Sequence, residues 1–189
     1  MALGSRNRRM VMDYVAYRLE RAHLDWVTRP ILPSPDTPCT FMRTIADEFR
    51  ERSKDRINDD MAERMHLVDS DSAQAVCGYC GVLNDLFEQE VKWGWIVGMF
   101  AFTGTLCECA AKRGKPELID AFVDAASSYC DTNLQPWIDD NGGWDGFVEY
   151  YKDKSRWGEI KWPSMTGIIC GAAAVTAVGV ATMALLSRT

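Results

Sequence analysis

The uncharged run from Trp93 to Cys107 places the strongest constraint on how this chain can fold. It contains 15 residues without an acidic or basic side chain. A helix that is apolar on all sides is stable in water only when other elements cover all of it. The run is too short to cross a bilayer, which takes ~20 residues. The Lys112–Gly114 tripeptide is typical of a helix end, and Pro116 is typical of the first turn of the next helix. The run therefore predicts the central helix of a helical bundle.

The composition limits the class of protein. A chain of 189 residues is long enough for one domain with a substantial core. Its net charge of −6 argues against a general nucleic-acid-binding protein. Seven cysteines, an odd number in no disulfide-like spacing, favour a reducing compartment. No apolar segment follows the first basic residues, so no secretory signal is expected.

Apolar residues recur every three or four positions along much of the remaining chain, which is the period of an amphipathic helix. No stretch alternates apolar and polar residues as a strand does, so the fold class is predicted to be all-α. In the first helical segment Arg8, Arg9, Arg18 and Arg21 fall mostly off the apolar face, and we expect them to be solvated. The expected helices span about residues 7–25, with Asn7 as the N-cap, and residues 39–58, 73–88, 116–133, 136–143 and 144–151.

The C-terminal segment differs in composition from the rest of the chain. No charged residue lies between Lys161 and Arg188, and small and aliphatic residues predominate. This length suits one membrane-spanning helix, and the basic residues before it suit a cytoplasmic membrane surface. We therefore expect a helical bundle over residues 1–160 and a transmembrane tail anchor over residues 164–186. The alternatives are a further core helix and an apolar helix that folds back on its own domain.

No candidate catalytic or metal-binding residues form a pattern with known chemistry. The Cys77–Cys80 segment matches the C-x-x-C motif of redox enzymes, but that motif needs a βαβ context, which is not visible here. Cys107 and Cys109 add two more thiols, but the spacing fits no common zinc site. The sequence therefore predicts a protein that is not an enzyme and that holds no metal and no cofactor.

Four segments, in this order along the chain, resemble the homology regions of the Bcl-2 family of apoptosis regulators. Asn7–Trp26 is similar to the N-terminal region typical of pro-survival members, and Phe41–Arg52 (FMRTIADEFRER) resembles the BH3 motif. Leu86–Cys107 looks like the first homology region, whose usual core is N-W-G-R. Pro136–Tyr151 (PWIDDNGGWDGFVEYY) resembles the second region almost completely. The chain's own BH3-like motif consists of Met42 in place of the usual Leu, Ile45, Ala46 in place of the usual Gly, Asp47 and Phe49.

The resemblance implies a Bcl-2-like bundle of about eight helices around a buried central hydrophobic helix, plus a C-terminal transmembrane helix. It also implies a surface groove that binds the amphipathic BH3 helices of pro-apoptotic partners. For Leu86 and Phe102, a place in the ordinary core is an equally good interpretation. By segment matching, the groove residues would be Phe49, Arg52, Ile57, Val82, Leu86, Lys92, Trp93, Gly94, Trp95, Val97, Ala101, Phe102 and Tyr151.

One groove position departs from the family pattern. The usual N-W-G-R reads Lys92-Trp93-Gly94-Trp95, so tryptophan stands where the family's arginine meets the invariant aspartate of the partner. Tryptophan offers an indole N–H but no charge. Lys92, three residues earlier and expected on the same helical face, is the nearest candidate cation, and Arg52 is another. We therefore expect apolar contacts to hold the partner helix, with Lys92 as a weaker ion-pair donor.

Three functions are compatible with this resemblance. The N-terminal match and the intact Asn141–Phe147 segment favour a pro-survival protein that sequesters BH3 helices. Such a protein would sit at the outer mitochondrial membrane or the endoplasmic reticulum, with its domain facing the cytosol. The alternatives are a pore-forming pro-apoptotic effector of the same family, and a membrane-anchored helical adaptor that binds no BH3 helix. Homodimers or heterodimers are compatible with each of these, and no nucleic-acid partner is expected.

Overall fold

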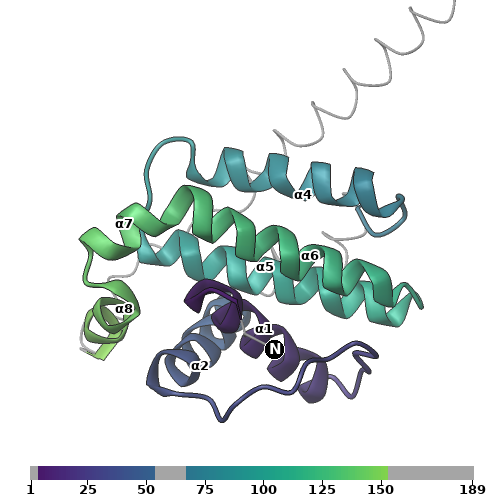
Figure 1. Cartoon of the computed structure of the whole chain (residues 1–189), viewed down its shortest axis with the longest axis horizontal. Helices are drawn as coiled ribbons and strands as arrows, with labels where there is room; N and C mark the ends of the chain where they lie inside the picture. The colour runs from purple at the N-terminus through teal and green to yellow at the C-terminus, as the bar shows by residue number, and fades with distance from the viewer. Residues whose placement is uncertain (1–3, 54–66, 153–189) are drawn as a thin grey trace, which may run out of the picture.

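The computed structural model describes residues 4–53 and 67–152 of the chain. Every regular element in these two ranges is a helix, which confirms the predicted all-α fold. The expected tail anchor at residues 164–186 lies outside the described residues. Figure 1 shows the arrangement of the helices. They are α1 Arg6–Arg21, α2 Thr37–Arg52, α4 Ser72–Phe87, α5 Trp93–Lys112, α6 Pro116–Tyr129, the π-helix η1 Cys130–Leu134, α7 Gln135–Asp140 and α8 Gly143–Lys152.

The central helix predicted from the uncharged run is α5. Trp93 and all of residues 96–110 are buried, and α1, α2, α4 and α6 each contact this helix. Figure 1 shows α5 extending along α6, with α4 on one side and α1 and α2 on the other. At Gly104 a Cβ atom would lie 3.0 Å from Tyr14 Cε1, so the absence of a side chain lets α1 approach α5 closely. The prediction of a helix covered on all sides is confirmed.

Short polar side chains cap three of the helices. Ser5, Asp36 and Asp71 each accept a hydrogen bond from a backbone N–H in the first turn of α1, α2 and α4. The prediction that Asn7 caps the first helix is wrong, because Ser5 fills that position. α1 also ends at Arg21 rather than near residue 25.

Asn7 is instead buried and bonded to side chains that lie more than a hundred residues later in the chain. Its Nδ2 atom donates hydrogen bonds to Asp131 Oδ1 at 2.8 Å and to Gln135 Oε1 at 2.5 Å. Its Oδ1 atom accepts a hydrogen bond from Trp144 Nε1 at 2.9 Å. A buried amide is costly unless it is hydrogen-bonded, and these three bonds satisfy it. The side chain therefore joins α1 to η1, α7 and α8.

The helix predicted over residues 116–133 is not continuous. After Tyr129, α6 gives way to the π-helical turn η1, which changes the register of the residues that follow. With this turn, Cys130 and Leu134 are both buried and Gln135 reaches Asn7. A π-helical turn adds one residue to the helix, and the spacing of apolar residues in the sequence does not reveal it.

Glycines shape the tight turn between α7 and α8. Gly142 has a φ of +82°, in the left-handed region that favours glycine. At Gly146 a Cβ atom would lie 1.9 Å from the carbonyl oxygen of Asn141, a distance that no side chain tolerates. This turn directs Trp144 and Phe147 back towards Trp93 at the start of α5.

Replacing Asn7 by alanine should lower the free energy of unfolding by about 1–3 kcal/mol, because the buried Trp144 N–H would lose its acceptor. Urea unfolding followed by tryptophan fluorescence measures this. Asn84→Ala is the matched control, since Asn84 is exposed on α4. The control should change the free energy of unfolding by less than about 0.5 kcal/mol. Equal effects of the two substitutions would mean that the Asn7 bonds do not stabilise the bundle.

Candidate functional site

The start of α5 is set by one extended residue. Lys92 is the N-cap (φ −143°, ψ 153°), and its carbonyl oxygen accepts hydrogen bonds from Trp95 N at 3.0 Å and Ile96 N at 3.1 Å. Its side chain makes no capping bond and pairs with Glu90. The expectation that Lys92 and Trp95 share a helical face is therefore wrong, because Lys92 precedes the helix.

Trp93 holds this turn in a cluster of aromatic rings. Its ring centroid lies 4.9 Å from that of Trp137, 5.9 Å from that of Trp144 and 5.4 Å from that of Phe147. The rings are tilted or edge-on, which is the geometry that aromatic pairs prefer. Phe147 also contacts Tyr151, with ring centroids 5.1 Å apart. The cluster fixes the start of α5 against α7 and α8.

The predicted groove residues come from α2, α4, α5 and α8. α2 and α4 both contact α5, and α8 contacts α2. Most of the predicted groove side chains are buried. Burial is expected both for the wall of a helix-binding groove and for the ordinary core, so their role in binding stays a prediction. Ile57 lies outside the described residues. Phe49, Val82, Leu86, Trp93, Val97, Ala101, Phe102 and Tyr151 are buried, Gly94 and Trp95 are half-buried, and Arg52 and Lys92 are exposed.

The two candidate cations lie near opposite ends of α5. Arg52 is the last residue of α2 and pairs with Glu48. Arg50, two residues earlier, pairs with Glu108 near the end of α5 at 3.2 Å. Glu108 is thirteen residues from Trp95, which is about 20 Å along a helix. Lys92 is therefore the nearer of the two cations to Trp95.

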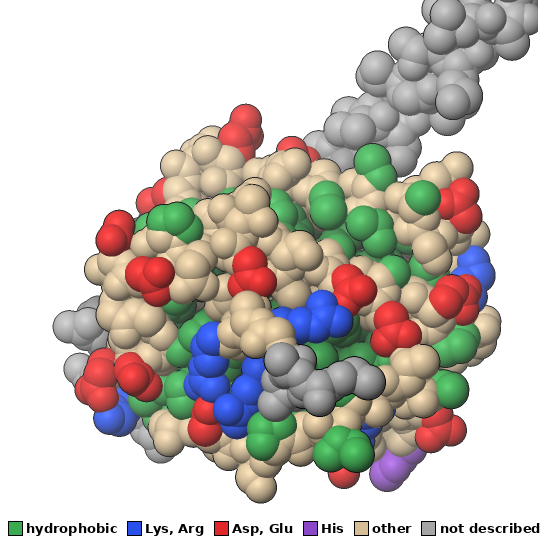
Figure 2. Space-filling view, in the orientation of Figure 1, with side chains coloured by type: hydrophobic (Ala, Val, Ile, Leu, Met, Phe, Trp, Pro, Cys, Tyr) green, Lys and Arg blue, Asp and Glu red, His purple; other side chains and the backbone are tan. Residues whose placement is uncertain are grey.

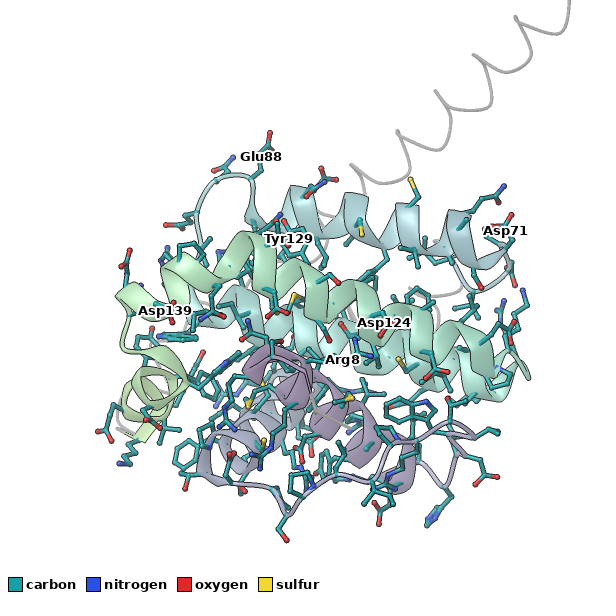
Figure 3. All side chains as sticks on the ribbon, viewed as in Figure 1. Arg8, Asp71, Glu88, Asp124, Tyr129 and Asp139 are labelled. Atoms are coloured by element: carbon teal, nitrogen blue, oxygen red, sulfur yellow. The ribbon has the colours of Figure 1, made fainter. Side chains whose placement is uncertain are left out.

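Two surface clefts lie away from the aromatic cluster. One, of about 670 Å³, opens beside α1 and α2, and its lining is mostly charged. The other, of about 510 Å³, lies between α4 and α6 and includes Tyr129 and Asp124, which Figure 3 labels. Of the predicted groove residues within the described ranges, only Arg52 borders either cleft. The charged cleft is lined by Arg18, Arg21, Thr44, Asp47, Glu48, Arg50, Glu51 and Arg52.

The BH3-like helix α2 is packed into the bundle by its apolar motif residues. Met42, Ile45, Ala46 and Phe49 are each 1% exposed or less. The resemblance to the Bcl-2 family implies that a BH3 helix enters the groove of another protein with these residues. In this structure they contribute to the chain's own core.

Ion pairs tie successive turns of α2 to its neighbours. Positions 43, 47 and 50 are four and three residues apart, so they lie on the same side of the helix. Tyr17 and Arg21 of α1 also donate hydrogen bonds to Asp47. Arg21 also forms an ion pair with Asp47. The other ion pairs are Arg43–Asp13 at 2.7 Å, Asp47–Arg18 at 2.8 Å and Arg50–Glu108 at 3.2 Å.

Glu108 is the buried centre of this network. Glu108 is 4% exposed. Its carboxylate accepts hydrogen bonds from Arg18 Nε at 2.8 Å and from Arg50 Nη2 at 3.2 Å. A buried carboxylate is tolerated only when cations and hydrogen-bond donors surround it. The expectation that Arg18 is solvated is wrong, because Glu108 and Asp47 bind it in the interior.

Sequence reasoning missed this network. The one signal for it is a single acidic residue, Glu108, inside a helix that is otherwise uncharged up to Lys112. A buried acid requires a cationic partner, so the residue could have been expected to recruit an arginine. Which arginines reach it follows only from the packing of α1 and α2 against α5.

The cysteines give no catalytic or metal-binding arrangement in the described part of the chain. The six cysteines described are free thiols, and no group of three or more potential metal ligands occurs among the described residues. Burial raises the pKa of the Cys80, Cys107 and Cys130 thiols, so they stay protonated at neutral pH. Cys77 and Cys80 both lie within α4.

Replacing Glu108 by glutamine should lower the free energy of unfolding by about 3 kcal/mol, because the ion pairs of Arg18 and Arg50 with this buried carboxylate would be lost. The measurement is again urea unfolding. Glu117→Gln, at an exposed position in the first turn of α6, is the matched control and should cost less than about 0.5 kcal/mol. A loss at Glu108 no larger than that at Glu117 would rule out the network as a stabilising element.

Comparisons with known proteins identify the family of this chain. The model of the Bcl-2 family, described as apoptosis regulator proteins, matches residues 42–144, which is more than half of the chain. Apoptosis regulator R1 of Xenopus laevis is 31% identical over 185 aligned residues, and the match covers 93% of this chain and 75% of that protein. Human Bcl-2-like protein 1 is 34% identical over 110 residues, which cover 58% of this chain and 46% of the human protein.

A solved structure has a similar fold. It is the crystal structure of trBcl-2L2 from Trichoplax adhaerens bound to trBak BH3, with a TM-score of 0.67 and 23% identity. The match covers 77% of this chain and 97% of that one. A family of apoptosis regulators agrees with the prediction of a binding protein rather than an enzyme. From the family model and the relationship to R1, this chain belongs to the Bcl-2 family of apoptosis regulators.

Proposed function

We propose that the chain is a pro-survival member of the family that sequesters the BH3 helices of pro-apoptotic partners. Its site is the groove predicted from the sequence around the first half of α5. Recognition of this kind lays the apolar face of an amphipathic helix into an apolar trough. The Trichoplax adhaerens protein of similar fold, which is bound to a BH3 segment, supports this mode of binding for the present chain.

The retention of α2 is the observation that favours a pro-survival protein over an effector. An effector has to release its own BH3 helix before it dimerises and permeabilises a membrane. Here that release would break the Arg43–Asp13, Asp47–Arg18 and Arg50–Glu108 pairs. These pairs are part-buried, so breaking each costs less than the about 3–5 kcal/mol of a fully buried pair. Three such losses are still sizeable beside the about 5–15 kcal/mol that stabilises a whole domain. Release of α2 is therefore strongly opposed.

The composition of the groove supports binding through apolar contacts. Its predicted walls are aromatic and aliphatic, and Trp95 carries no charge. Burial of apolar surface contributes about 25 cal/mol per Å², so a helix with three or four large apolar residues gains affinity without an ion pair. Lys92 already pairs with Glu90. This pairing reduces the attraction that Lys92 can offer to the aspartate of an incoming helix.

We also propose that residues 164–186 anchor the protein in the outer mitochondrial membrane or the endoplasmic reticulum, with the bundle in the cytosol. The length of this segment and its lack of charge support an anchor. Among the described helices, α5 alone is long and apolar enough to cross a membrane, and 83% of its most apolar window is buried in the bundle. That burial favours a core position for α5.

Expression in yeast beside a pore-forming effector of the family tests the proposed function. The full-length chain should restore growth that the effector alone abolishes, because sequestration of BH3 helices blocks the effector. Colony survival is the measurement. Death of yeast that express this chain without an effector would instead support an effector function, and no influence on survival in either case would support the adaptor.

A groove variant separates helix binding from other means of rescue. Gly94→Arg should abolish rescue, since a long side chain would project from a half-buried position in the first turn of α5. The matched control is Gly81→Arg on α4, where an added Cβ atom meets nothing within 4 Å. Rescue that survives Gly94→Arg at equal expression would exclude this groove as the site.

A further inference from the structure

Carboxylates are frequent in the segment that leads into α5, where the family's arginine is missing. Asp85 in the last turn of α4 and Glu88 and Glu90 in the α4–α5 connection are all exposed. Figure 3 shows Glu88 projecting from this connection, clear of the helices. Lys92 is the single basic residue between residues 82 and 97. The segment that leads into α5 therefore carries three exposed negative groups and one positive group.

The positive charge on this rim is already engaged. Lys92 pairs with Glu90, and the two side chains are 61% and 51% exposed. Asp85 and Glu88 then have no neighbouring cation in this stretch of the chain. The N-terminus of α5 contributes a partial charge of about +0.5, which offsets only part of the remaining two negative charges. An aspartate on a bound helix would enter a negative environment.

The helices packed against the start of α5 add further negative charge. Trp93 contacts Trp137 of α7 and Phe147 of α8. Figure 2 shows carboxylates around this end of the molecule, at the left of the view. The exposed charged residues of these two helices are Asp139, Asp140, Asp145, Glu149 and Lys152, and Lys152 pairs with Glu149.

Trp95 replaces the arginine with a side chain that suits a cation. Its ring is half-buried against the core, so part of the indole remains accessible. Among aromatic side chains, the indole ring binds ammonium and guanidinium groups best. Substitution of arginine by tryptophan thus changes both the charge of the position and the kind of group that it can contact.

We propose that this end of the groove selects helices with a basic residue in place of the aspartate that the family's other partners share. The inference rests on the proposed function and names the partner class within it. Like charges placed together across an interface act against binding, and complementary charges favour it. The apolar groove residues hold either kind of helix, and the carboxylates of the segment before α5 distinguish between them.

The test uses the full-length chain in nanodiscs and three versions of the trBak BH3 peptide, with aspartate, alanine or lysine at that position. Isothermal titration calorimetry measures the three affinities. At 50 mM salt the lysine version should bind about fivefold more tightly than the aspartate version, and at 500 mM salt the ratio should fall below about twofold because salt screens exposed charges. Two outcomes would contradict the inference. If the aspartate version binds as tightly as the lysine version, or more tightly, the inference is overturned and the proposed function stands. If none of the three versions binds, the proposed function and this inference are both contradicted.

Variants of the chain identify the groups responsible. Trp95→Arg should reverse the preference, so that the aspartate version binds about tenfold more tightly than the lysine version. The double variant Asp85→Asn/Glu88→Gln should bring the two affinities to within about twofold at 50 mM salt, because it removes the two carboxylates that Lys92 does not pair with. Glu117→Gln, in the first turn of α6 and beyond the C-terminal end of α5, should leave the preference intact. A fivefold preference that persists in the double variant would contradict the assignment to these carboxylates.

Discussion

Burial of α5 on all sides is the constraint on which the rest of the structure depends. The other long helices are amphipathic, and each places an apolar face against this one helix. None of them could remain folded as a single surface helix in water, because most helical stability comes from packing of an apolar face. Close approach at Gly104 and the aromatic cluster around Trp93 set how α1, α7 and α8 lie against it.

The two ends of α5 have different chemical characters, and this division organises the function. Near its end, Glu108 binds Arg18 and Arg50 and so holds the chain's own BH3-like helix in place. At its start, Trp93 and Trp95 stand beside exposed carboxylates. One helix thus retains the internal BH3-like segment at one end and offers the proposed contact for a foreign helix at the other. Retention of α2 and capture of a partner are therefore compatible in one folded state.

Much of the fold could be predicted from the sequence because the signals are local. The uncharged run identified α5, and apolar periodicity located the other helices to within a few residues. The errors arose where long-range contacts decide the outcome. Asparagine is a residue type favoured at N-caps. The hydrogen-bond partners of Asn7 are instead Asp131, Gln135 and Trp144, which lie more than a hundred residues away in the chain. Arg18 resembles any surface arginine until Glu108 is placed beside it.

The candidate site was predictable in part. Segment matching identified the residues around the start of α5, and the departure at Trp95 is visible in the sequence alone. The position of Lys92 before the helix and its pairing with Glu90 were not predictable. The spacing of apolar residues does not distinguish an N-cap residue from a residue in the first turn. The sequence contains Glu88 and Glu90, but only the fold relates them to the carboxylates of α7 and α8.

The most direct test of helix binding at the start of α5 is to follow the indole N–H signals of the ¹⁵N-labelled full-length chain during titration with a BH3 peptide. Trp93 and Trp95 lie at the proposed site, whereas Trp26 donates a hydrogen bond to Asp120 of α6 at 2.9 Å. The account predicts that the Trp93 and Trp95 signals move while the Trp26 signal stays in place. Saturable binding that shifts the Trp26 signal and leaves Trp93 and Trp95 unchanged would contradict it.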